Sequence, residues 1–374
     1  MNDMKRPKIG ILSLYHDNYN MGGLLQAYAL TYLLNKLDAD AEQISLDYKI
    51  YYSAGIKRTL KKIKKSVQPL LINRRFQSRI SNFSRFMNSI NHSRGCQELS
   101  SICNNYDKIV VGSDQVWGEW LPDEALNLFL LGVDNFDGVR YSYAASIGAD
   151  EISEKGKEFY INNLSRFKTV SVRERGAQLA LQKIGIVARV DVDPTILLST
   201  AEWNLVSKNV HKPEEYIFCY FLGKEKKYRE VASEIASKLS LPIVTMPYVS
   251  HNKSEEYDEG FGDYQDFESG PEGFIDLIKH AKVVLTDSFH ATVFATKYHI
   301  NFFSLARIID GDSSSNGRLV DYLSMINMLD RFVSPIELLD KVCEITVDYS
   351  LFDECLKPYI ECGKEYLMSI VEDS

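Results

Sequence analysis

His290 follows a buried strand, and its neighbours suit it to acid–base chemistry. Residues 282–286 form an apolar, β-branched run that predicts a strand, and Asp287 and Ser288 are natural N-cap residues for a following helix. His290 then falls in the first helical turn, where unpaired N–H groups can hold an anion. A nearby Asp287 carboxylate would set the tautomer of an imidazole that titrates near neutral pH. A histidine near a helix start is more often structural, but its place at a strand end favours function.

A second group of polar side chains follows the apolar run at 108–112. Asp114 and Gln115 can pair with sugar hydroxyls, and Trp117 can stack on the C–H face of a sugar ring. Ligands of parallel sheets gather at the carboxyl ends of strands, which favours a sugar site here. The alternative is that Asp114 caps the next helix and Trp117 packs in the core.

Two arginines are candidates for binding an anion. Arg173 ends a strand at 169–173, and a guanidinium forks well onto phosphate or carboxylate oxygens. An ion pair with Glu174 or Asp191 is the alternative for Arg173. Arg318 follows the polar loop 313–317, and it either closes over an anionic ligand or is a solvated helix start.

Paired glycines separate the first expected strand, 8–14, from a helix expected over 24–37. Gly22 and Gly23 would let a phosphate or sugar approach the backbone closely, with Asn20 and Gln26 beside them. The spacing is not the dinucleotide-binding pattern G-x-G-x-x-G, and a plain turn explains the glycines equally well.

Strand-like runs alternate with helical patterns along most of the chain, which predicts parallel α/β units. At 374 residues the chain exceeds the size of one ordinary core, and Asp193-Pro194 marks the expected boundary between two domains. The tail, 335–374, is expected to be helical and to pack back on the first domain. The expected strands lie at 8–14, 108–114, 139–145, 169–173, 216–222, 242–246, 282–286 and 301–305.

Composition indicates a cytoplasmic protein that needs no metal. The six cysteines form no C-x-x-C pair, residues 1–8 are polar, and no apolar run approaches the roughly 20 residues of a membrane-spanning helix. No cluster of residues has the spacing of metal ligands. The net charge of −8 does not favour nucleic acid as a partner.

The charges are unevenly distributed. Residues 57–85 contain ten Lys or Arg and no acid, within an expected helical insertion at 53–90 of the first domain. Interleaved apolar residues suit this segment to peripheral contact with the inner face of a membrane or with a lipid diphosphate, although a solvated helix is the commoner explanation. Residues 255–272 contain eight Asp or Glu and no basic residue, which is typical of a mobile loop, a lid or a solubilising insertion.

Together these segments resemble the polysaccharide pyruvyl transferase family. The resemblance runs in order through residues 8–323 and leaves out only the tail. The matching motifs are Asn20-x-Gly22-Gly23-x-x-Gln26, Val111-Gly112-Ser113-Asp114-Gln115-x-Trp117, Ser142-Tyr143-Ala144-Ala145-Ser146-Ile147-Gly148, Ser171-Val172-Arg173-Glu174, Val192-Asp193-Pro194-Thr195 and Asp287-Ser288-Phe289-His290.

The resemblance implies an α/β fold of two facing Rossmann-like domains, similar to GT-B glycosyltransferases, with the active site in the interdomain cleft. Residues 1–194 would be the acceptor side and residues 195–334 the donor side. Phosphoenolpyruvate would be the donor, without a further cofactor, and a sugar or lipid-linked oligosaccharide the acceptor. The product would be a pyruvate ketal in a capsule or exopolysaccharide.

The resemblance also implies roles for the candidate residues. His290 would be the general acid, Arg173 would stabilise the leaving phosphate, and Asp114 would orient the acceptor or act as its base. Family members often carry an arginine where this chain has Ser288, so Arg173 or Arg318 would have to supply that charge. Donor contacts would come from Arg173, Ser288, His290 and Arg318, and acceptor contacts from Asn20, Gly22, Gly23, Gln26, Gln115 and Trp117.

Two other functions fit the same sequence. A GT-B glycosyltransferase that uses a nucleotide sugar would share the fold and a basic face toward the membrane. A non-catalytic sugar-binding module is the second alternative, because Ser288 stands at the arginine position.

Overall fold

The structure is a computed structural model. The structure describes residues 6–16, 19–46, 76–95, 98–250, 253–254, 256–307, 316–341 and 347–373. Two compact units are present, and each is built from segments that are separated in the sequence. The first unit comprises Met1–Leu71, Met87–Leu197 and Tyr359–Ser374, and the second comprises Ile72–Phe86 and Leu198–Pro358.

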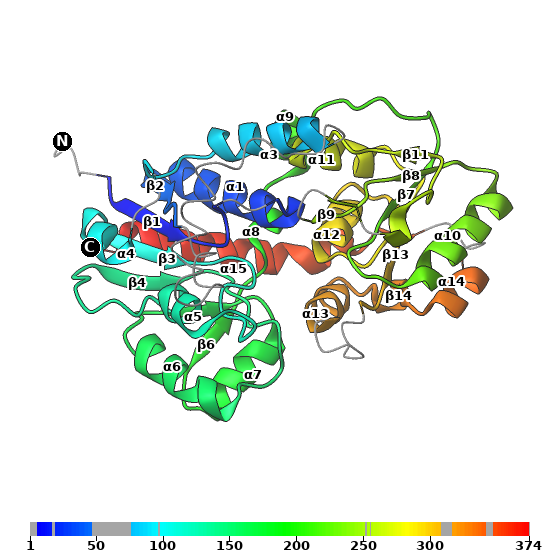
Figure 1. Ribbon diagram of the computed structural model, residues 1–374. Helices are drawn as coiled ribbons and strands as arrows, with labels where there is room; N and C mark the ends of the chain where they lie inside the picture. Colours follow the sequence, from blue (N-terminus) through cyan, green and yellow to red (C-terminus); the bar gives the residue numbers. More distant parts are fainter. Residues whose placement is uncertain are drawn as a thin grey trace. The chain divides into compact units, whose positions relative to one another are not determined.

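A parallel sheet forms the centre of the first unit (Figure 1). Its strand order is β2-β1-β3-β4, and isolated bridges from Tyr141 to Thr169 and from Ala145 to Val172 continue it to β5, which pairs with β6. The chain adds β2 on one side of β1 and β3 on the other, so the carboxyl ends of β1 and β3 form a switch point where such sheets bind ligands. The strands are β1 (Lys8–Leu12), β2 (Asp40–Gln43), β3 (Lys108–Val111), β4 (Val139–Ser142), β5 (Val170–Val172) and β6 (Ala188–Val190).

Helices cover this first sheet, and the last of them is anchored by a buried lysine. Lys108 of β3 donates from Nζ to the carbonyl oxygens of Ile370 (2.7 Å) and Val371 (3.0 Å), so it binds the C-terminal end of α15. Tyr366 of α15 also donates to the carbonyl oxygen of Ser142 in β4 (2.9 Å). The helices are α1 (Met21–Lys36), α4 (Leu99–Ile102), η4 (Cys103–Asn105), α5 (Asp123–Phe129), α6 (Glu154–Leu164), α7 (Arg175–Lys183), α8 (Pro194–Leu197) and α15 (Phe352–Glu372), of which α15 begins in the second unit.

The second unit contains a six-stranded sheet of order β11-β8-β7-β12-β13-β14, in which all pairs are parallel. Its switch point lies between β7 and β12, again at the carboxyl ends of adjacent strands. The strands are β7 (Ile217–Tyr220), β8 (Ile243–Thr245), β11 (Tyr264–Gln265), β12 (Val283–Thr286), β13 (Asn301–Leu305) and β14 (Phe332–Val333), and a separate antiparallel pair consists of β9 (Val249–Ser250) and β10 (Lys253–Ser254). The helices are α9 (Thr200–Val206), α10 (Lys226–Leu239), η5 (Glu256–Asp258), α11 (Pro271–Lys279), α12 (Phe289–Lys297), α13 (Gly317–Met325), η7 (Leu329–Arg331), α14 (Pro335–Lys341) and part of α3 (Gln77–Ser89).

The described end of the basic segment belongs to the second unit, although the whole insertion was expected in the first domain. Residues 57–75 lie outside the described part of the chain. Arg79 of α3 is buried and donates to the carbonyl oxygens of Pro247 (2.6 Å) and Asp266, and Arg85 pairs with Glu272 (2.7 Å). These two arginines therefore anchor α3. The local sequence could not reveal this role, because the carbonyl and carboxylate partners are more than 160 positions away.

The acidic stretch is also integrated into the fold, contrary to the expectation of a mobile loop or lid. Buried Asp258 pairs with Arg229 of α10 (2.7 Å), and Asp263 accepts a hydrogen bond from the Ile243 amide (2.8 Å). Glu272 pairs with Lys208 (2.5 Å) as well as with Arg85. These carboxylates hold the stretch from Glu256 onward against neighbouring elements, and position 255 lies outside the described residues.

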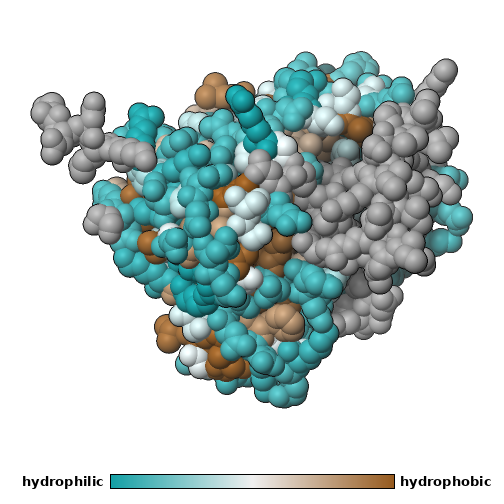
Figure 2. Space-filling model, turned by 60° about the vertical axis from the view of Figure 1, so that its left-hand side comes forward, coloured by the Kyte–Doolittle hydropathy of each residue, from teal (hydrophilic) through white to brown (hydrophobic). Residues whose placement is uncertain are grey.

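One face of the described residues is mainly polar. Figure 2 shows hydrophilic residues over most of the coloured face, with hydrophobic residues in small scattered groups. Within the described ranges, no helix combines the length and the apolar composition that crossing a membrane requires.

Candidate functional site

Strained backbone marks the carboxyl edge of the first sheet. Gly112, directly after β3, has φ +120°, and a Cβ there would lie 2.3 Å from the carbonyl oxygen of Tyr143. Asp114 (φ +69°) and Ala144 (φ +46°) are non-glycine residues in the left-handed region. Such conformations are uncommon and tend to gather at functional sites, so this edge is the first place to look for one.

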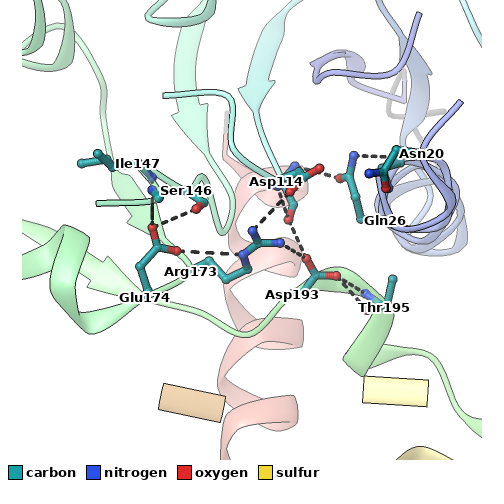
Figure 3. A network of polar contacts seen from close by, with 12 residues as sticks. Asn20, Gln26, Asp114, Ser146, Ile147, Arg173, Glu174, Asp193 and Thr195 are labelled. Carbon is teal, nitrogen blue, oxygen red and sulfur yellow. Dashed lines mark hydrogen bonds and ion pairs between the residues drawn. The ribbon is translucent and has the colours of Figure 1, made fainter. Parts of the chain in front are cut away.

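Arg173 lies at the centre of a buried charge network on this edge. Its Nη1 is 2.8 Å from Asp193 Oδ2, its Nη2 is 3.2 Å from Asp114 Oδ1, and its Nε is 3.9 Å from Glu174 Oε2. Figure 3 shows the guanidinium between Asp114 and Asp193, with Glu174 on its other side. Burial acts to lower the pKa of Arg173, but Asp114, Asp193 and Glu174 act to raise it and prevail, so the guanidinium stays charged.

This environment differs from the one predicted for Arg173. The sequence suggested a guanidinium that meets a phosphate, with Glu174 or Asp191 as the alternative partners. Three carboxylates surround it, among them Glu174, one of the alternative partners, so the cluster carries more formal negative than positive charge, which disfavours a phosphate. The strongest partners, Asp114 and Asp193, are 59 and 20 positions away in the sequence, which is why local sequence did not reveal them.

Two of the three carboxylates are held by further hydrogen bonds. Asp193 accepts from Ser113 Oγ (3.0 Å), Thr195 N (3.0 Å) and Thr195 Oγ1 (2.7 Å). Glu174 Oε1 accepts from the Ser146 hydroxyl and from the two amides that follow it, at 2.8 to 3.0 Å. Asp114 is the most exposed of the three carboxylates, at 15% against 0% and 4%. Asp114 is thus the member of this network best placed to meet a ligand.

The segment around Gly22 and Gly23 is part of a helix that contacts the loop after β3, and it does not form an open loop. Helix α1 begins at Met21, so Gly22 and Gly23 lie buried in its first turn, where the sequence predicted a loop up to residue 23. Asn20 caps the helix by accepting from the Gly23 amide (3.0 Å). Gln26 is fully buried, accepts from the Ser113 amide (3.1 Å) and donates to the Gly23 carbonyl (2.8 Å). The predicted acceptor contact by Gln26 is therefore replaced by a link between α1 and the loop after β3.

The predicted stacking residue, Trp117, lies in the core. Its side chain is fully buried, Nε1 donates to the Phe129 carbonyl (2.9 Å), and the ring packs edge-on against Phe167. Sequence reasoning missed Trp120, which is 55% exposed in the same loop, with its indole against Gly118. Gln115 is partly exposed, and its amide lies against Gly148.

A buried carboxylate joins the two strands at the switch point of the second sheet. Asp287, directly after β12, accepts from the Leu222 amide (2.8 Å) and the Gly223 amide (2.6 Å), which follow β7. Its side chain is fully buried. Asp287 was expected to set the tautomer of His290. In the structure its carboxylate accepts hydrogen bonds from these two amides and so holds the loop after β7.

Ser288 and His290 begin the helix that the sequence predicted. Ser288 is the N-cap of α12 and accepts from the Ala291 amide (3.5 Å), while its own amide donates to Thr286 Oγ1 (3.0 Å). His290 lies in the first turn, largely buried, with its ring edge-on to Phe289. The imidazole of His290 thus lies at the carboxyl edge of the second sheet, where ligands of such sheets bind.

A further arginine, Arg307, lies at this edge and was not selected from the sequence. It follows β13, the strand beside β12, and its Nη2 donates to the Asp287 carbonyl (3.0 Å). A charged residue directly after an apolar strand, 301–305, was the signal that could have identified it. Arg318 lies partly buried in the first turn of α13.

The described residues contain no group of three or more His, Cys, Asp or Glu side chains that could hold a metal ion.

Comparisons with known proteins identify a family and a fold. A model of the polysaccharide pyruvyl transferase family matches residues 20–307. No curated protein matches the sequence significantly.

Solved structures share the architecture at low sequence identity. UDP-GlcNAc 2-epimerase from Methanocaldococcus jannaschii is 13% identical, with a TM-score of 0.51 over 90% of this chain and 91% of that one. MnaA from S. aureus, solved with UDP, is 10% identical, with a TM-score of 0.53 over 94% and 91% of the two chains. UGT89C1 from Arabidopsis thaliana, complexed with UDP-L-rhamnose, is 9% identical, with a TM-score of 0.50 over 99% and 95%. At these identities the likeness shows the fold alone, and it confirms the predicted GT-B-like α/β class.

Proposed function

Because the chain belongs to the polysaccharide pyruvyl transferase family, we propose that it joins the enolpyruvyl group of phosphoenolpyruvate to two sugar hydroxyls as a pyruvate ketal. The observation that carries the proposal is the contrast between the two strand-end sites. The first exposes Asp114 from a cluster of three carboxylates around one guanidinium. The second has His290 in the first turn of α12 and the guanidinium of Arg307 on the same sheet edge.

We assign one substrate to each site from the charged groups that the site contains. Phosphoenolpyruvate is a multiply charged anion, so the acidic cluster of the first unit disfavours it, whereas the second unit offers the guanidinium of Arg307 with a single carboxylate, Asp287, beside it. The N-terminus of α12 adds a favourable dipole for an anion. Neutral sugar hydroxyls, in contrast, hydrogen-bond well to a carboxylate such as Asp114.

In this proposal His290 is the general acid. Protonation of C3 of phosphoenolpyruvate makes C2 electrophilic, and the first sugar hydroxyl attacks C2. The C2–O bond to phosphate breaks, the second hydroxyl attacks the same carbon, and the ketal closes. One of the two hydroxyl protons balances the proton used at C3, and the other leaves with inorganic phosphate. A positioned acid typically contributes 10²- to 10⁴-fold in rate, roughly the share assigned to His290.

Asp114 is the proposed acceptor carboxylate, and Arg173 holds it in position. Exposed Trp120 takes the stacking role first assigned to Trp117, because aromatic faces suit the C–H side of a sugar ring.

A lipid-linked acceptor at the inner membrane face is part of the same proposal, and it is motivated by the acid-free basic run at 57–85. Residues 57–75 of this run lie outside the described part of the chain. Replacing Lys61, Lys62, Lys64 and Lys65 by Gln should weaken binding to anionic vesicles and turnover of a lipid-linked acceptor. Unchanged binding and turnover would contradict the membrane role.

The alternative is a glycosyl transfer from a nucleotide sugar, because structures of the same fold were solved with UDP and UDP-L-rhamnose. The two donors are distinguished by a thermal shift with phosphoenolpyruvate against UDP and GDP sugars, followed by phosphate release with galactose-, glucose- and mannose-type acceptors. Stabilisation by phosphoenolpyruvate and acceptor-dependent release of phosphate would support pyruvyl transfer. Stabilisation by a nucleotide sugar alone would favour glycosyl transfer.

A further inference from the structure

We propose that Arg307 binds the phosphate of the donor and so supplies the positive charge that Ser288 lacks. The inference rests on the proposed function, because it names the residue that holds the donor in the second unit. Arg307 is proposed for this task in place of the two candidates from the sequence, Arg173 and Arg318.

The position of Arg307 follows from the sheet. β13 pairs with β12 in parallel register, from Val283 opposite Asn301 to Thr286 opposite Ser304, so both strands end at the same edge. Arg307 lies just after β13, and Ser288 lies just after β12. The guanidinium is therefore delivered to the switch-point edge from the neighbouring strand.

The backbone at Arg307 is fixed by one buried side chain. Asn316 accepts from the Arg307 amide (2.8 Å) and donates to the Arg307 carbonyl (2.9 Å). Such a paired clamp limits the movement of the residue, so ordering the guanidinium around an anion costs less entropy.

The guanidinium itself is held at one nitrogen. Nη2 donates to the Asp287 carbonyl (3.0 Å), and Nε lies 3.7 Å from Asp287 Oδ2, which already accepts from the Gly223 amide. Among the described residues, Nε is buried without a hydrogen-bond partner, although the side chain as a whole is 20% exposed. A guanidinium held in this way is oriented and retains donors for a ligand, which suits a phosphate's oxygens.

Two other arginines of the second unit are committed elsewhere. Arg79 donates to two backbone carbonyls and is fully buried. Arg229 pairs with Asp258 and donates to the carbonyls of Gly223 and Glu225. Arg307 is partly exposed and lies at the switch-point edge, and neither Arg79 nor Arg229 has both properties.

The test compares Arg307→Gln and Arg307→Lys with the control Arg331→Gln. Arg331 is a suitable control because it is a guanidinium of the same unit that is paired with Asp330 and lies over the Phe303 ring, before β14. Dissociation constants for phosphoenolpyruvate and for inorganic phosphate are measured by titration calorimetry, together with the KM of the acceptor and the thermal midpoint.

Arg307→Gln should weaken binding of phosphoenolpyruvate and of phosphate about 10- to 100-fold, since hydrogen bonds to charged groups are the strong ones. The KM of the acceptor should stay within about twofold, Arg307→Lys should recover part of the affinity, and Arg331→Gln should bind like the wild type.

Wild-type affinity for phosphate and phosphoenolpyruvate in Arg307→Gln would overturn the inference. An equal loss of donor and acceptor affinity with a lowered thermal midpoint would also overturn it, because that is the signature of a structural brace for Asp287. Failure of the proposed function looks different: the wild type would bind the donor through Arg307 and yet form no ketal with any acceptor.

Discussion

Asp114 lies where a buried network reaches the surface. Its carboxylate is paired with Arg173. Its backbone is in the left-handed region and is held by hydrogen bonds, including one that the Ser146 amide donates to the Asp114 carbonyl (2.9 Å). A side chain oriented in this way suits the positioning of a substrate hydroxyl at little entropic cost.

The change Asp114→Asn keeps the shape of the side chain and removes its charge. We expect kcat/KM for the acceptor to fall about 10- to 100-fold, while the dissociation constant of phosphoenolpyruvate stays near the wild-type value. Steady-state kinetics with varied acceptor and calorimetry with the donor measure the two effects separately. A weakened donor with an unaffected acceptor would show that Asp114 belongs to the donor site.

Arg173 should matter for stability more than for donor binding. Removing the guanidinium by Arg173→Met leaves three carboxylates close together in the interior, which should cost about 3–5 kcal/mol in the free energy of unfolding. Chemical denaturation measures the loss. The matched control is Arg166→Met, whose partly exposed pair with Asp134 should cost at most about 1 kcal/mol. A stable Arg173→Met protein that had lost only its affinity for phosphoenolpyruvate would restore the role first predicted for Arg173.

The loop after β3 depends on a glycine that no other residue can replace without strain. A Cβ at Gly112 would meet the Tyr143 carbonyl at 2.3 Å, and φ is +120°. Gly112→Ala should therefore lower the free energy of unfolding by about 3 kcal/mol, from backbone strain and overpacking together. Gly185→Ala is the control, because φ is +84° but nothing lies within 4 Å of a Cβ, and about 1–2 kcal/mol is expected. Equal losses in the two variants would contradict the close approach at Gly112.

Elements with an apolar run could be predicted from the sequence, and elements without one could not. The strands expected at 108–114 and 282–286 contain β3 and β12, respectively. β2 (Asp40–Gln43) was missed because its sequence is polar, and its buried Gln43 is paired with Ser13 and Thr31 in ways that only the fold reveals.

The candidate site was predictable in its positions and less so in its partners. Asp114, Arg173 and His290 follow the ends of the strands that the sequence predicted, since position along a strand is a local property. The ion pairs of Arg173 and the hydrogen bonds of Asp287 join distant segments, so they depend on topology and could not be read from neighbouring residues.

Buried tyrosines make the whole molecule sensitive to alkaline pH. Burial raises the pKa of Tyr143, Tyr160, Tyr216 and Tyr366 above the ordinary value of 10, and it raises the pKa of Tyr298 to about 12. A raised pKa in the folded state means that the folded protein binds more protons than the unfolded chain above about pH 10. The stability from these residues is thus fully present below pH 10 and is lost as the pH rises through the folded pKa values.

We therefore expect the free energy of unfolding to fall steadily above about pH 10, and the tyrosines to ionise together with unfolding. Denaturation at a series of pH values, combined with ultraviolet absorbance of tyrosinate, tests this. Full tyrosine ionisation in a protein that keeps its circular dichroism would contradict the burial.

The proposed chemistry is tested most directly by running the reaction in D₂O with phosphoenolpyruvate and a purified acceptor, and analysing the product by mass spectrometry and NMR. The wild type and the control His280→Gln, altered at a partly exposed histidine at the end of α11, should form a pyruvate ketal whose methyl group carries one solvent deuterium. His290→Gln should form it at least about 100-fold more slowly. A product that keeps its methylene as an enolpyruvyl ether, or an unchanged rate in His290→Gln, would contradict ketal formation through protonation by His290.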